Sequence, residues 1–313
     1  MYIFSNIIGI FVFDDKFKIV DEILFKDFED YQKKDKFIQQ IQNKHKNLKE
    51  LDDEAIKKIL FYFKNKKFFF DFRNKNLQLA KLDVKNSVID DVLIIQAINT
   101  IVELDKAINI LAKRLREWYE LYNPEFSRTM ENHEKFVEGI LDKDKNELLE
   151  KLSVNASDSI GADLEQEDIE PIKSLGHQIY DLYQLRKSQL EYISTLMDKF
   201  CPNTKAVCGV LVGASLIEHA GSLKRLSEMP ASTIQILGAE KALFRHMKTG
   251  AKSPRHGLIV NHPLIAKAPD RMHGKIARAL ADKISIASKI DYFQGKFIGD
   301  KLIKELEEKF ENI

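Results

Sequence analysis

The apolar residues near the start of the chain are arranged as short runs. Two runs rich in β-branched and aromatic residues, 7–13 and 17–25, flank Asp14 and Asp15. Aspartate is common in turns, so this arrangement predicts a β-hairpin. A later run with four phenylalanines around one aspartate, 68–72, predicts another strand.

Between these runs, apolar residues recur at helical spacing over 28–46 and 52–64. Asp52 and Asp53 lie where the second of these segments begins, and either can cap a helix. The runs and the helical segments together predict a small α/β domain over residues 1–85. Its core is expected to be rich in phenylalanine.

The pattern changes over 94–122, where apolar residues alternate at spacings of three and four without a break. A seam of this kind is typical of helices that supercoil with a partner. The expected helix is about 43 Å long at a rise of 1.5 Å per residue. The central members of the seam are Ile101, Leu104, Ile108, Leu111, Leu115 and Trp118.

A second long helix is expected to start near Pro171, after an acidic connector at 161–170, because proline is tolerated in the first turn of a helix. Its seam is interrupted by Arg186 and Gln189. Polar residues at such positions fix the register of paired helices at some cost in stability. The two helices predict an antiparallel coiled-coil hairpin over 86–202. The seam alone leaves open whether the hairpin also pairs with a second copy.

The C-terminal third is more basic than the rest of the chain. Residues 203–295 contain 14 Lys and Arg against 6 Asp and Glu, a balance of +8. The whole chain has a net charge of +1, so the remainder carries −7, the difference between these values. Such asymmetry indicates that a polyanion binds at one end of the protein. A well-solvated lysine-rich surface is the alternative explanation.

Arginine is concentrated in the same region, since five of the ten arginines lie between residues 225 and 278. Arginine presents a planar, permanently charged fork that binds two phosphate oxygens at once or stacks on a base. Lysine is sufficient where diffuse charge is needed only for solubility. The concentration of arginine therefore favours a nucleic-acid surface.

Three basic residues at i, i+4 and i+7 share one stripe of a helix expected over 240–249. They are Lys241, Arg245 and Lys248. The apolar residues Leu243, Phe244 and Met247 are expected to face the core on the opposite side, and Gly250 to end the helix. Simple pairing with a neighbouring surface acid is the alternative explanation for Lys241.

The loop after this helix carries further basic residues and is stiffened by Pro254. Its candidates for RNA contact are Lys252, Arg255 and His256. An imidazole beside an arginine can stack on an unpaired base, which contributes about 1–3 kcal/mol per base. A second basic stripe follows around Gly274, formed by Arg271, Lys275 and Arg278. His246 and His262 are expected to be structural, and plain solvation is the alternative for the second stripe.

Several other functions are disfavoured by the sequence. Gly209 and Gly213 lack the lysine and the spacing of a nucleotide-binding loop, so they are interpreted as sites of close helix packing. We find no metal-ligand spacing and no nucleophile–base pair, so an enzyme that acts on RNA is not expected. Cys201 and Cys208 are expected to be free thiols of a cytoplasmic protein. The chain shows no signal peptide, and no apolar stretch reaches the roughly 18–20 residues of a membrane span.

Four strings in the basic region resemble the Nop domain. GAEKALFRHMKTG (238–250) is preceded by AGSLKRLSEMPASTIQIL (220–237). It is followed by SPRHGLIVNHPLI (253–265) and GKIARALADKISIASKIDYFQG (274–295). The chain is therefore identified as similar to the archaeal Nop-domain core proteins of box C/D guide ribonucleoproteins.

The resemblance implies a multidomain α+β protein with three parts. The small α/β domain (1–85) would bind a fibrillarin-type methyltransferase, and the coiled coil (86–202) would form a homodimer. The all-α Nop domain (203–313) would bind a box C/D guide RNA at a kink-turn already occupied by a ribosomal-protein-like protein. The implied recognition elements are residues 238–246 and 253–257.

The resemblance also implies a non-catalytic scaffold for RNA-guided ribose 2′-O-methylation in rRNA and tRNA processing. The scaffold would hold no cofactor, because the methyltransferase carries the S-adenosylmethionine. Two alternatives stay open: a coiled-coil protein adaptor without direct RNA recognition, and a Nop scaffold of the splicing type.

Overall fold

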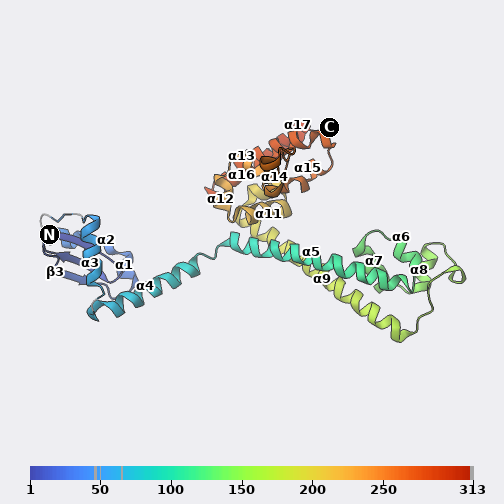
Figure 1. The fold of residues 1–313 in the computed structure, drawn as a ribbon, viewed down its shortest axis with the longest axis horizontal. Helices are drawn as coiled ribbons and strands as arrows, with labels where there is room; N and C mark the ends of the chain where they lie inside the picture. The colour runs from blue at the N-terminus through green and yellow to red at the C-terminus, as the bar shows by residue number, and fades with distance from the viewer. Residues whose placement is uncertain (46–47, 50, 65, 311–313) are drawn as a thin grey trace. The chain divides into compact units, whose positions relative to one another are not determined.

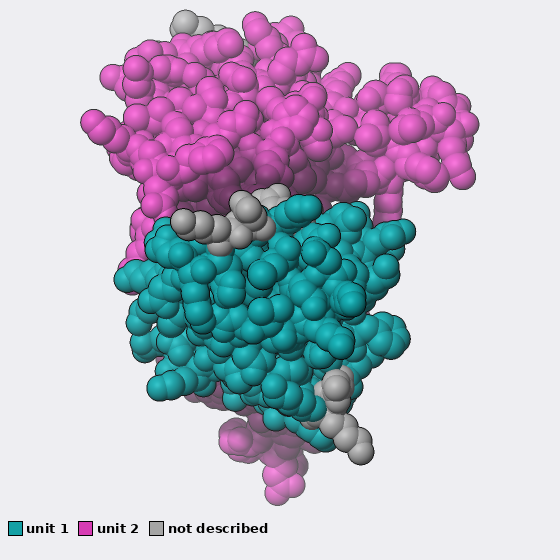
Figure 2. Space-filling view, turned by 90° about the vertical axis from the view of Figure 1, so that its left-hand side faces the viewer, with its two compact units in different colours: residues 1–88 teal, residues 89–313 magenta. Residues whose placement is uncertain are grey.

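The computed structural model describes residues 1–45, 48–49, 51–64 and 66–310 (Figure 1). The chain divides into two compact units, residues 1–88 and 89–313, which Figure 2 distinguishes by colour. The expected division into three functional domains stays a prediction.

A three-stranded antiparallel sheet begins the first unit. It contains β1 (Tyr2–Ser5), β2 (Gly9–Phe13) and β3 (Ile19–Leu24) in the order β1-β2-β3. The predicted hairpin is confirmed by β2 and β3, whereas β1 was not expected as a separate strand. The Asp14 carboxylate fixes the turn, because it accepts hydrogen bonds from the backbone N–H groups of Lys16 (2.9 Å) and Lys18 (2.8 Å).

Helices cover both faces of this sheet. The predicted helix over 28–46 is divided at Lys33 into α1 (Phe28–Gln32) and α2 (Lys34–Lys44), and position 46 lies outside the described residues. The helix predicted over 52–64 is α3 (Asp53–Tyr62). Asp52 caps it, as expected, by accepting from the backbone N–H of Ala55 at 2.7 Å.

The strand predicted over 68–72 is wrong. These residues lie in α4 (Lys66–Asn86), where helical spacing places Phe68 and Phe72 toward the core and leaves Phe70 65% exposed. The sheet supplies two apolar layers because successive side chains point to opposite faces. Phe11 and Phe13 pack with residues of α3 and α4, whereas Ile10 and Val12 pack with Phe25 and α2.

Two long helices dominate the first part of the second unit. They are α5 (Asp90–Glu120) and α9 (Gln166–Phe200), which pack antiparallel to each other. The expected start near Pro171 is wrong. The helix already begins at Gln166, and Pro171 lies inside it because the acidic residues of the expected connector form the first turn.

The apolar seam of α5 packs mainly within the chain. Ile101, Ile108 and Leu115 are buried, and Leu104 and Leu111 are partly buried against the same cores. The last predicted member, Trp118, is 39% exposed, and Tyr119 takes its place in the core. Five of the six seam residues are therefore occupied by the helical hairpin itself.

Arg186 interrupts the seam of α9 in a specific way. Its Nε and Nη2 lie 2.5 Å and 3.2 Å from Oδ1 and Oδ2 of Asp105 on α5. A bidentate ion pair between arginine and a carboxylate has a defined geometry, so it fixes the register of the two helices. The predicted role of the polar position is consistent with this contact.

An additional group of helices lies between α5 and α9 in sequence and was not predicted. It contains α6 (Pro124–Thr129), α7 (His133–Asp142), α8 (Lys145–Lys151) and the 3₁₀ turn η1 (Ala156–Asp158). Arg116 of α5 stacks over Phe136 of α7 at 4.4 Å from the ring centroid. It also donates to the carbonyl oxygens of Ser127 (2.6 Å) and Met130. This group therefore forms one core with the hairpin.

The rest of the second unit consists of helices and the loops that join them, and no strand occurs among its described residues. Its elements are α10 (Pro202–Cys208), α11 (Val210–Ala220), α12 (Leu223–Glu228), α13 (Ala231–Ile236), α14 (Glu240–Thr249), η2 (Leu258–Asn261), α15 (Pro263–Ala266), α16 (Asp270–Tyr292) and α17 (Gly299–Phe310). The long helix α16 packs against α10, α12 and α13. At its end, the buried Asp291 accepts hydrogen bonds from the backbone and side chains of Asn203 and Thr204 at 2.7–3.1 Å.

Small residues let helices approach closely in this region. A Cβ atom on Gly213 would lie 2.7 Å from the terminal methyl of Met197, so the side chain of α9 packs directly against the backbone of α11 at this glycine. The packing interpretation therefore holds for Gly213 but is wrong for Gly209, which has open space around its Cα and ends α10 with φ +72°. Cys201 and Cys208 are free and buried, as expected, and burial raises the pKa of both thiols.

Candidate nucleic-acid interface

The predicted basic helix is α14, and glycines bound it at both ends. Gly238 has φ +85° and Gly250 has φ +70°, a backbone region that favours glycine. Helix α14 therefore ends at Gly250, as predicted. Lys241, Arg245 and Lys248 are all exposed along it.

The apolar side of α14 differs from the prediction. Phe244 is 57% exposed and Met247 is 73% exposed, and no residue of this helix is buried. The expectation that both side chains face the core is therefore wrong. Helix α14 lies at the edge of the helical core, so its amphipathic pattern produces an exposed apolar stripe beside the basic one. The Lys248 ammonium lies 4.7 Å from the centre of the Phe244 ring, where the two stripes meet.

The loop between α14 and η2 is held by backbone contacts with α13 and the segment after it. Gly257 N–H donates to the Gln235 carbonyl and Leu258 N–H to the Leu237 carbonyl, both at 2.8 Å. The Gln235 side chain donates to the Arg255 carbonyl at 2.7 Å. A Cβ atom on Gly257 would lie 1.9 Å from the Leu237 oxygen, so only glycine permits this approach.

Arg255 lies directly above α16. Its side chain passes the backbone of Gly274, where a Cβ atom would lie 3.9 Å from it, an ordinary van der Waals distance. The Arg255 Nη1 donates to the Asp270 backbone oxygen (3.2 Å) and Oδ2 (3.3 Å). The guanidinium is thus oriented in the free protein while it stays accessible.

A basic groove runs beside this contact, with a volume of about 940 Å³. It brings together four of the nine predicted RNA-binding residues: Arg255, Arg271, Lys275 and Arg278. Lys309 of α17 also lines the groove, whereas Asp282 supplies the one acidic side chain among its lining residues. Lys309 was not predicted, because more than thirty residues separate it from the second basic stripe and no local pattern links the two.

The other predicted residues do not line the groove. Lys241, Arg245, Lys248 and Lys252 lie on α14 and on the loop that follows it. The structure therefore presents two basic surfaces, one on α14 and one along α16. The loop that carries Arg255 connects these two surfaces, because it follows directly from α14 and its Arg255 lines the groove.

His256 is part of a small cluster rather than a fully free side chain. Its ring lies 5.6 Å from that of His273, which is hydrogen bonded to the Ala268 carbonyl at 2.9 Å. Partial burial is the main cause that lowers the pKa of His256, and the nearby His273 lowers it further. The neutral imidazole is therefore the favoured form, and a neutral ring is suited to stacking on a base.

His246 and His262, the two histidines predicted to be structural, have structural roles. His246 is half-buried and hydrogen bonded to the Ala251 carbonyl, which ties the end of α14 to the loop. His262 is buried, with Nε2 at 3.1 Å from the Val207 oxygen and Nδ1 accepting from Leu264 N–H at 3.2 Å. An acceptor Nδ1 requires a neutral ring, and burial lowers the pKa of His262.

The described residues provide neither a metal site nor a membrane span. They contain no group of three or more His, Cys, Asp or Glu side chains that could hold a metal ion. None of the helices described is long and apolar enough to cross a membrane.

A basic groove, a loop fixed by its backbone and an exposed basic helix are together typical of a nucleic-acid-binding surface. The family described as "Nop: snoRNA binding domain, fibrillarin" matches residues 100–312. The match covers more than half of the chain, which therefore belongs to the Nop family.

Named relatives are similar over much of the chain. An uncharacterized NOP5 family protein of Methanocaldococcus jannaschii is 42% identical over 275 residues, or 82% of this chain and 66% of that protein. Nucleolar protein 56 of Homo sapiens is 38% identical over 240 residues, covering 70% of this chain and 40% of the human protein. Nucleolar protein 58 of Aspergillus fumigatus is 40% identical over 215 residues, covering 64% of this chain and 36% of the fungal protein. The chain thus spans less than two thirds of the length of each of these relatives.

Proposed function

We propose that the chain is a non-catalytic scaffold of a box C/D guide ribonucleoprotein. The observation that carries the proposal is the position of Arg255, held over α16 at the mouth of a basic groove inside a region that matches a snoRNA-binding domain. Box C/D ribonucleoproteins guide ribose 2′-O-methylation. The scaffold would act in this reaction by placing the other components.

The two basic surfaces suit different parts of a folded RNA. The groove along α16 gathers the basic side chains of Arg271, Lys275 and Arg278, and phosphate contacts by such groups provide affinity that weakens with salt. The loop supplies Arg255 and His256, which can stack on a base that leaves the helix at a kink. Sequence-independent phosphate binding and shape recognition by the loop would together select a kink-turn.

The exposed apolar stripe of α14 favours recognition of RNA together with a protein. Phe244 and Met247 cannot contribute to phosphate binding, but they can bury apolar surface against a protein already bound to the kink-turn. A ribosomal-protein-like kink-turn binder would supply the protein surface that covers these side chains. The RNA and its bound protein would then form one composite surface for α14 and the loop.

The helical hairpin supplies the proposed self-association surface. Its inner seam is occupied, but α5 leaves Ile110 (69% exposed), Trp118 (39%) and Leu121 (63%) on its outer side. A second copy that covers these side chains would form the homodimer. The N-terminal unit would then carry a fibrillarin-type methyltransferase, which brings the S-adenosylmethionine, so this chain needs no cofactor. Holding the enzyme over the guide–substrate duplex accelerates the reaction by proximity and orientation.

A gel-shift experiment tests the RNA-binding part of the proposal. A kink-turn RNA is titrated with the wild-type chain, with and without the kink-turn-binding protein, and with an Arg255→Ala/His256→Ala variant. An Arg128→Ala/His177→Ala variant is the matched control, because it removes the same residue types from α6 and α9, outside the basic region. We expect a supershift that needs the kink-turn protein, survives in the control and is lost in the loop variant. Absence of a supershift with the wild type would instead support a protein adaptor without RNA recognition.

A further inference from the structure

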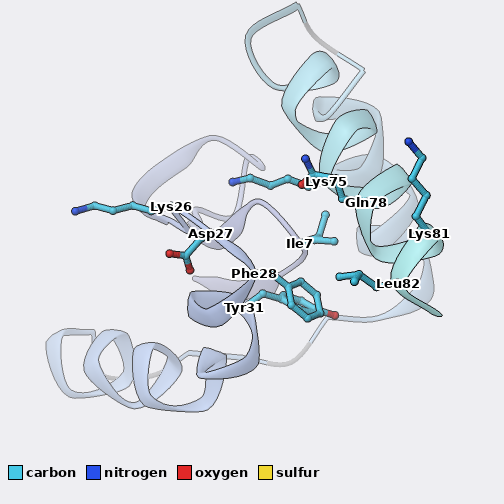
Figure 3. Close-up of a pocket in the computed structure, with 9 residues that line it drawn as sticks. All are labelled: Ile7, Lys26, Asp27, Phe28, Tyr31, Lys75, Gln78, Lys81 and Leu82. Atoms are coloured by element: carbon cyan, nitrogen blue, oxygen red, sulfur yellow. The ribbon is translucent and has the colours of Figure 1, made fainter. Parts of the chain in front are cut away.

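The N-terminal unit contains a pocket whose use the preceding observations do not explain. Its volume is about 370 Å³, and its lining residues come from the β1–β2 connection, the segment before α1, α1 itself and α4. Ile7, Phe28, Tyr31 and Leu82 converge between α1 and α4, as Figure 3 shows. The centre of the pocket is therefore apolar.

Hydrogen bonds at the pocket wall hold its shape. The Lys75 ammonium of α4 donates to the Phe25 carbonyl at 2.6 Å, which ties α4 to the end of β3. The Asp27 carboxylate accepts from Asp30 N–H at 3.0 Å and so caps α1, while Asp30 accepts from Lys26 N–H at 2.9 Å. Because these hydrogen bonds hold the wall in place, an incoming group would lose little free energy to reorganisation of the protein.

Positive charge flanks the apolar centre. Lys26 and Lys81 extend outward on opposite sides of the pocket (Figure 3), and neither lies within 4 Å of a carboxylate among the described residues. Lys75 lies between them, 3.3 Å from Asp71. Asp27 is the acidic residue of the lining, and its side chain is already engaged as a helix cap. An apolar group with carboxylates on either side would match both features.

We propose that this pocket is the docking point for the methyltransferase, which would insert a large apolar side chain flanked by acidic residues. The inference rests on the proposed function, because it presupposes that the N-terminal unit binds this enzyme. An apolar side chain buried in a preformed pocket is the usual source of affinity in a protein interface. Exposed lysines around it contribute mainly to the association rate and to specificity.

A second exposed apolar area in the same unit provides a comparison. Phe61 is 70% exposed and Phe70 is 65% exposed, on α3 and α4 respectively. Neither phenylalanine is a lining residue of this pocket, and the Lys64 ammonium lies over the Phe61 ring, 4.4 Å from its centre. The pocket is therefore the better docking point, and the aromatic area serves as the alternative in the test.

The test measures binding of the full chain to the fibrillarin-type methyltransferase from the same organism. The pocket variants are Leu82→Gln, whose side chain is 39% exposed at the rim, and Lys26→Glu/Lys81→Glu. Matched controls are Val84→Gln, 68% exposed on the same helix, and Lys36→Glu/Lys57→Glu, which makes the same charge change elsewhere in the unit. A Phe70→Gln variant probes the alternative area. Circular dichroism verifies that each variant is folded.

We expect Leu82→Gln to weaken binding by about tenfold, because it places a polar group against the apolar side chain that the methyltransferase would insert. The charge reversal should lower the association rate at low salt and lose this effect at high salt. The controls and Phe70→Gln should bind as the wild type does. Wild-type affinity in both pocket variants, or a loss confined to Phe70→Gln, would overturn the pocket assignment while the proposed function stands. Failure of the wild type to bind the enzyme would instead overturn the proposed role of the N-terminal unit.

Discussion

Arg255 and Asp270 form an ion pair at the mouth of the basic groove, with Nη1 of the arginine 3.3 Å from Oδ2 of the aspartate. Both side chains are more than half exposed, at 56% and 84%. The same nitrogen also donates to the Asp270 backbone oxygen at 3.2 Å. The Asp270 carboxylate therefore competes with any phosphate for this guanidinium. The contact with the Asp270 backbone oxygen would keep the arginine in place even if the carboxylate were removed.

An Asp270→Asn variant should bind kink-turn RNA more tightly than the wild type. Exposed ion pairs contribute about 0.2–1 kcal/mol, so we expect an increase of roughly two- to fivefold at low ionic strength. The gain should shrink as salt is added, because screening weakens both the pair and the RNA contact. Titration of the RNA–protein complex at two salt concentrations measures both effects.

Asp300→Asn provides the matched control, since Asp300 begins α17 and does not line the groove. It should leave the affinity unchanged. Weaker binding by Asp270→Asn would contradict this account, because it would mean that the carboxylate is needed to position Arg255.

Local sequence patterns predicted the elements whose spacing was unambiguous. The hairpin of β2 and β3 and the long helix α5 follow from alternation and from an unbroken seam. The phenylalanine run at 68–72 was misassigned because a short, continuous apolar run has no period that separates strand from helix. Its side chains meet Phe11 and Phe63 from a helix, an arrangement set by the rest of the unit.

The candidate site was predicted residue by residue but not as an arrangement. Basic spacing identified both stripes, yet it could not show that Arg255 and Lys309 line one groove, because that depends on how α16 and α17 pack. The pattern of α14 was correctly recognised as amphipathic. Its apolar side was assigned to the core because a buried face and an interface look the same in sequence, and only tertiary structure shows Met247 to be 73% exposed.

Replacement of Gly257 by alanine should disrupt RNA binding while the helices stay folded. The new Cβ would lie 1.9 Å from the Leu237 oxygen, so the loop must move and break the hydrogen bonds of Gly257 and Leu258 to the α13 segment. Strain of this kind costs about 1–3 kcal/mol. We expect a lower melting temperature and a loss of RNA affinity of about tenfold or more, measured by calorimetry and by gel shift.

Gly274→Ala is the corresponding control on α16. Its Cβ would lie 3.9 Å from the Arg255 side chain, which is an ordinary van der Waals distance. Alanine also favours a helix interior by about 1 kcal/mol over glycine. The variant should therefore be at least as stable as the wild type and should keep its RNA affinity. Equal RNA binding by the Gly257 and Gly274 variants would show that the loop geometry is not needed.

Self-association should depend on the outer side of α5. Trp118 and Leu121 are three residues apart, so they lie on one side of the helix. A Trp118→Glu/Leu121→Glu variant should be monomeric, because it places two charges within the proposed apolar contact. Light scattering during size-exclusion chromatography measures the mass. Val102→Glu/Ile286→Glu is the control, since Val102 (42% exposed) lies on α5 away from this pair and Ile286 (37%) on α16. A dimer in the Trp118 variant would place the contact elsewhere.

The stability of the second unit should depend on pH through His262. Burial lowers the pKa of this histidine, and the neutral ring accepts from Leu264 N–H while it faces the Val207 carbonyl. The unfolded chain, with a histidine pKa of about 6.5, then binds more protons than the folded chain below that pH. Stability is therefore fully present above the unfolded pKa and falls as the pH is lowered toward the folded pKa. Urea unfolding at pH 7.5 and pH 5.5 should show this loss.

A His262→Asn variant tests the assignment, because asparagine can still accept from Leu264 N–H at the start of α15 but does not titrate. Its free energy of unfolding should be lower than that of the wild type at pH 7.5, since the contact with Val207 is lost. The difference should narrow at pH 5.5, where the wild type alone is destabilised by protonation. A His177→Asn variant, in which an exposed histidine is replaced, should keep the wild-type pH dependence. If the His262→Asn variant also keeps the wild-type pH dependence of stability, another group controls the acid sensitivity of the fold.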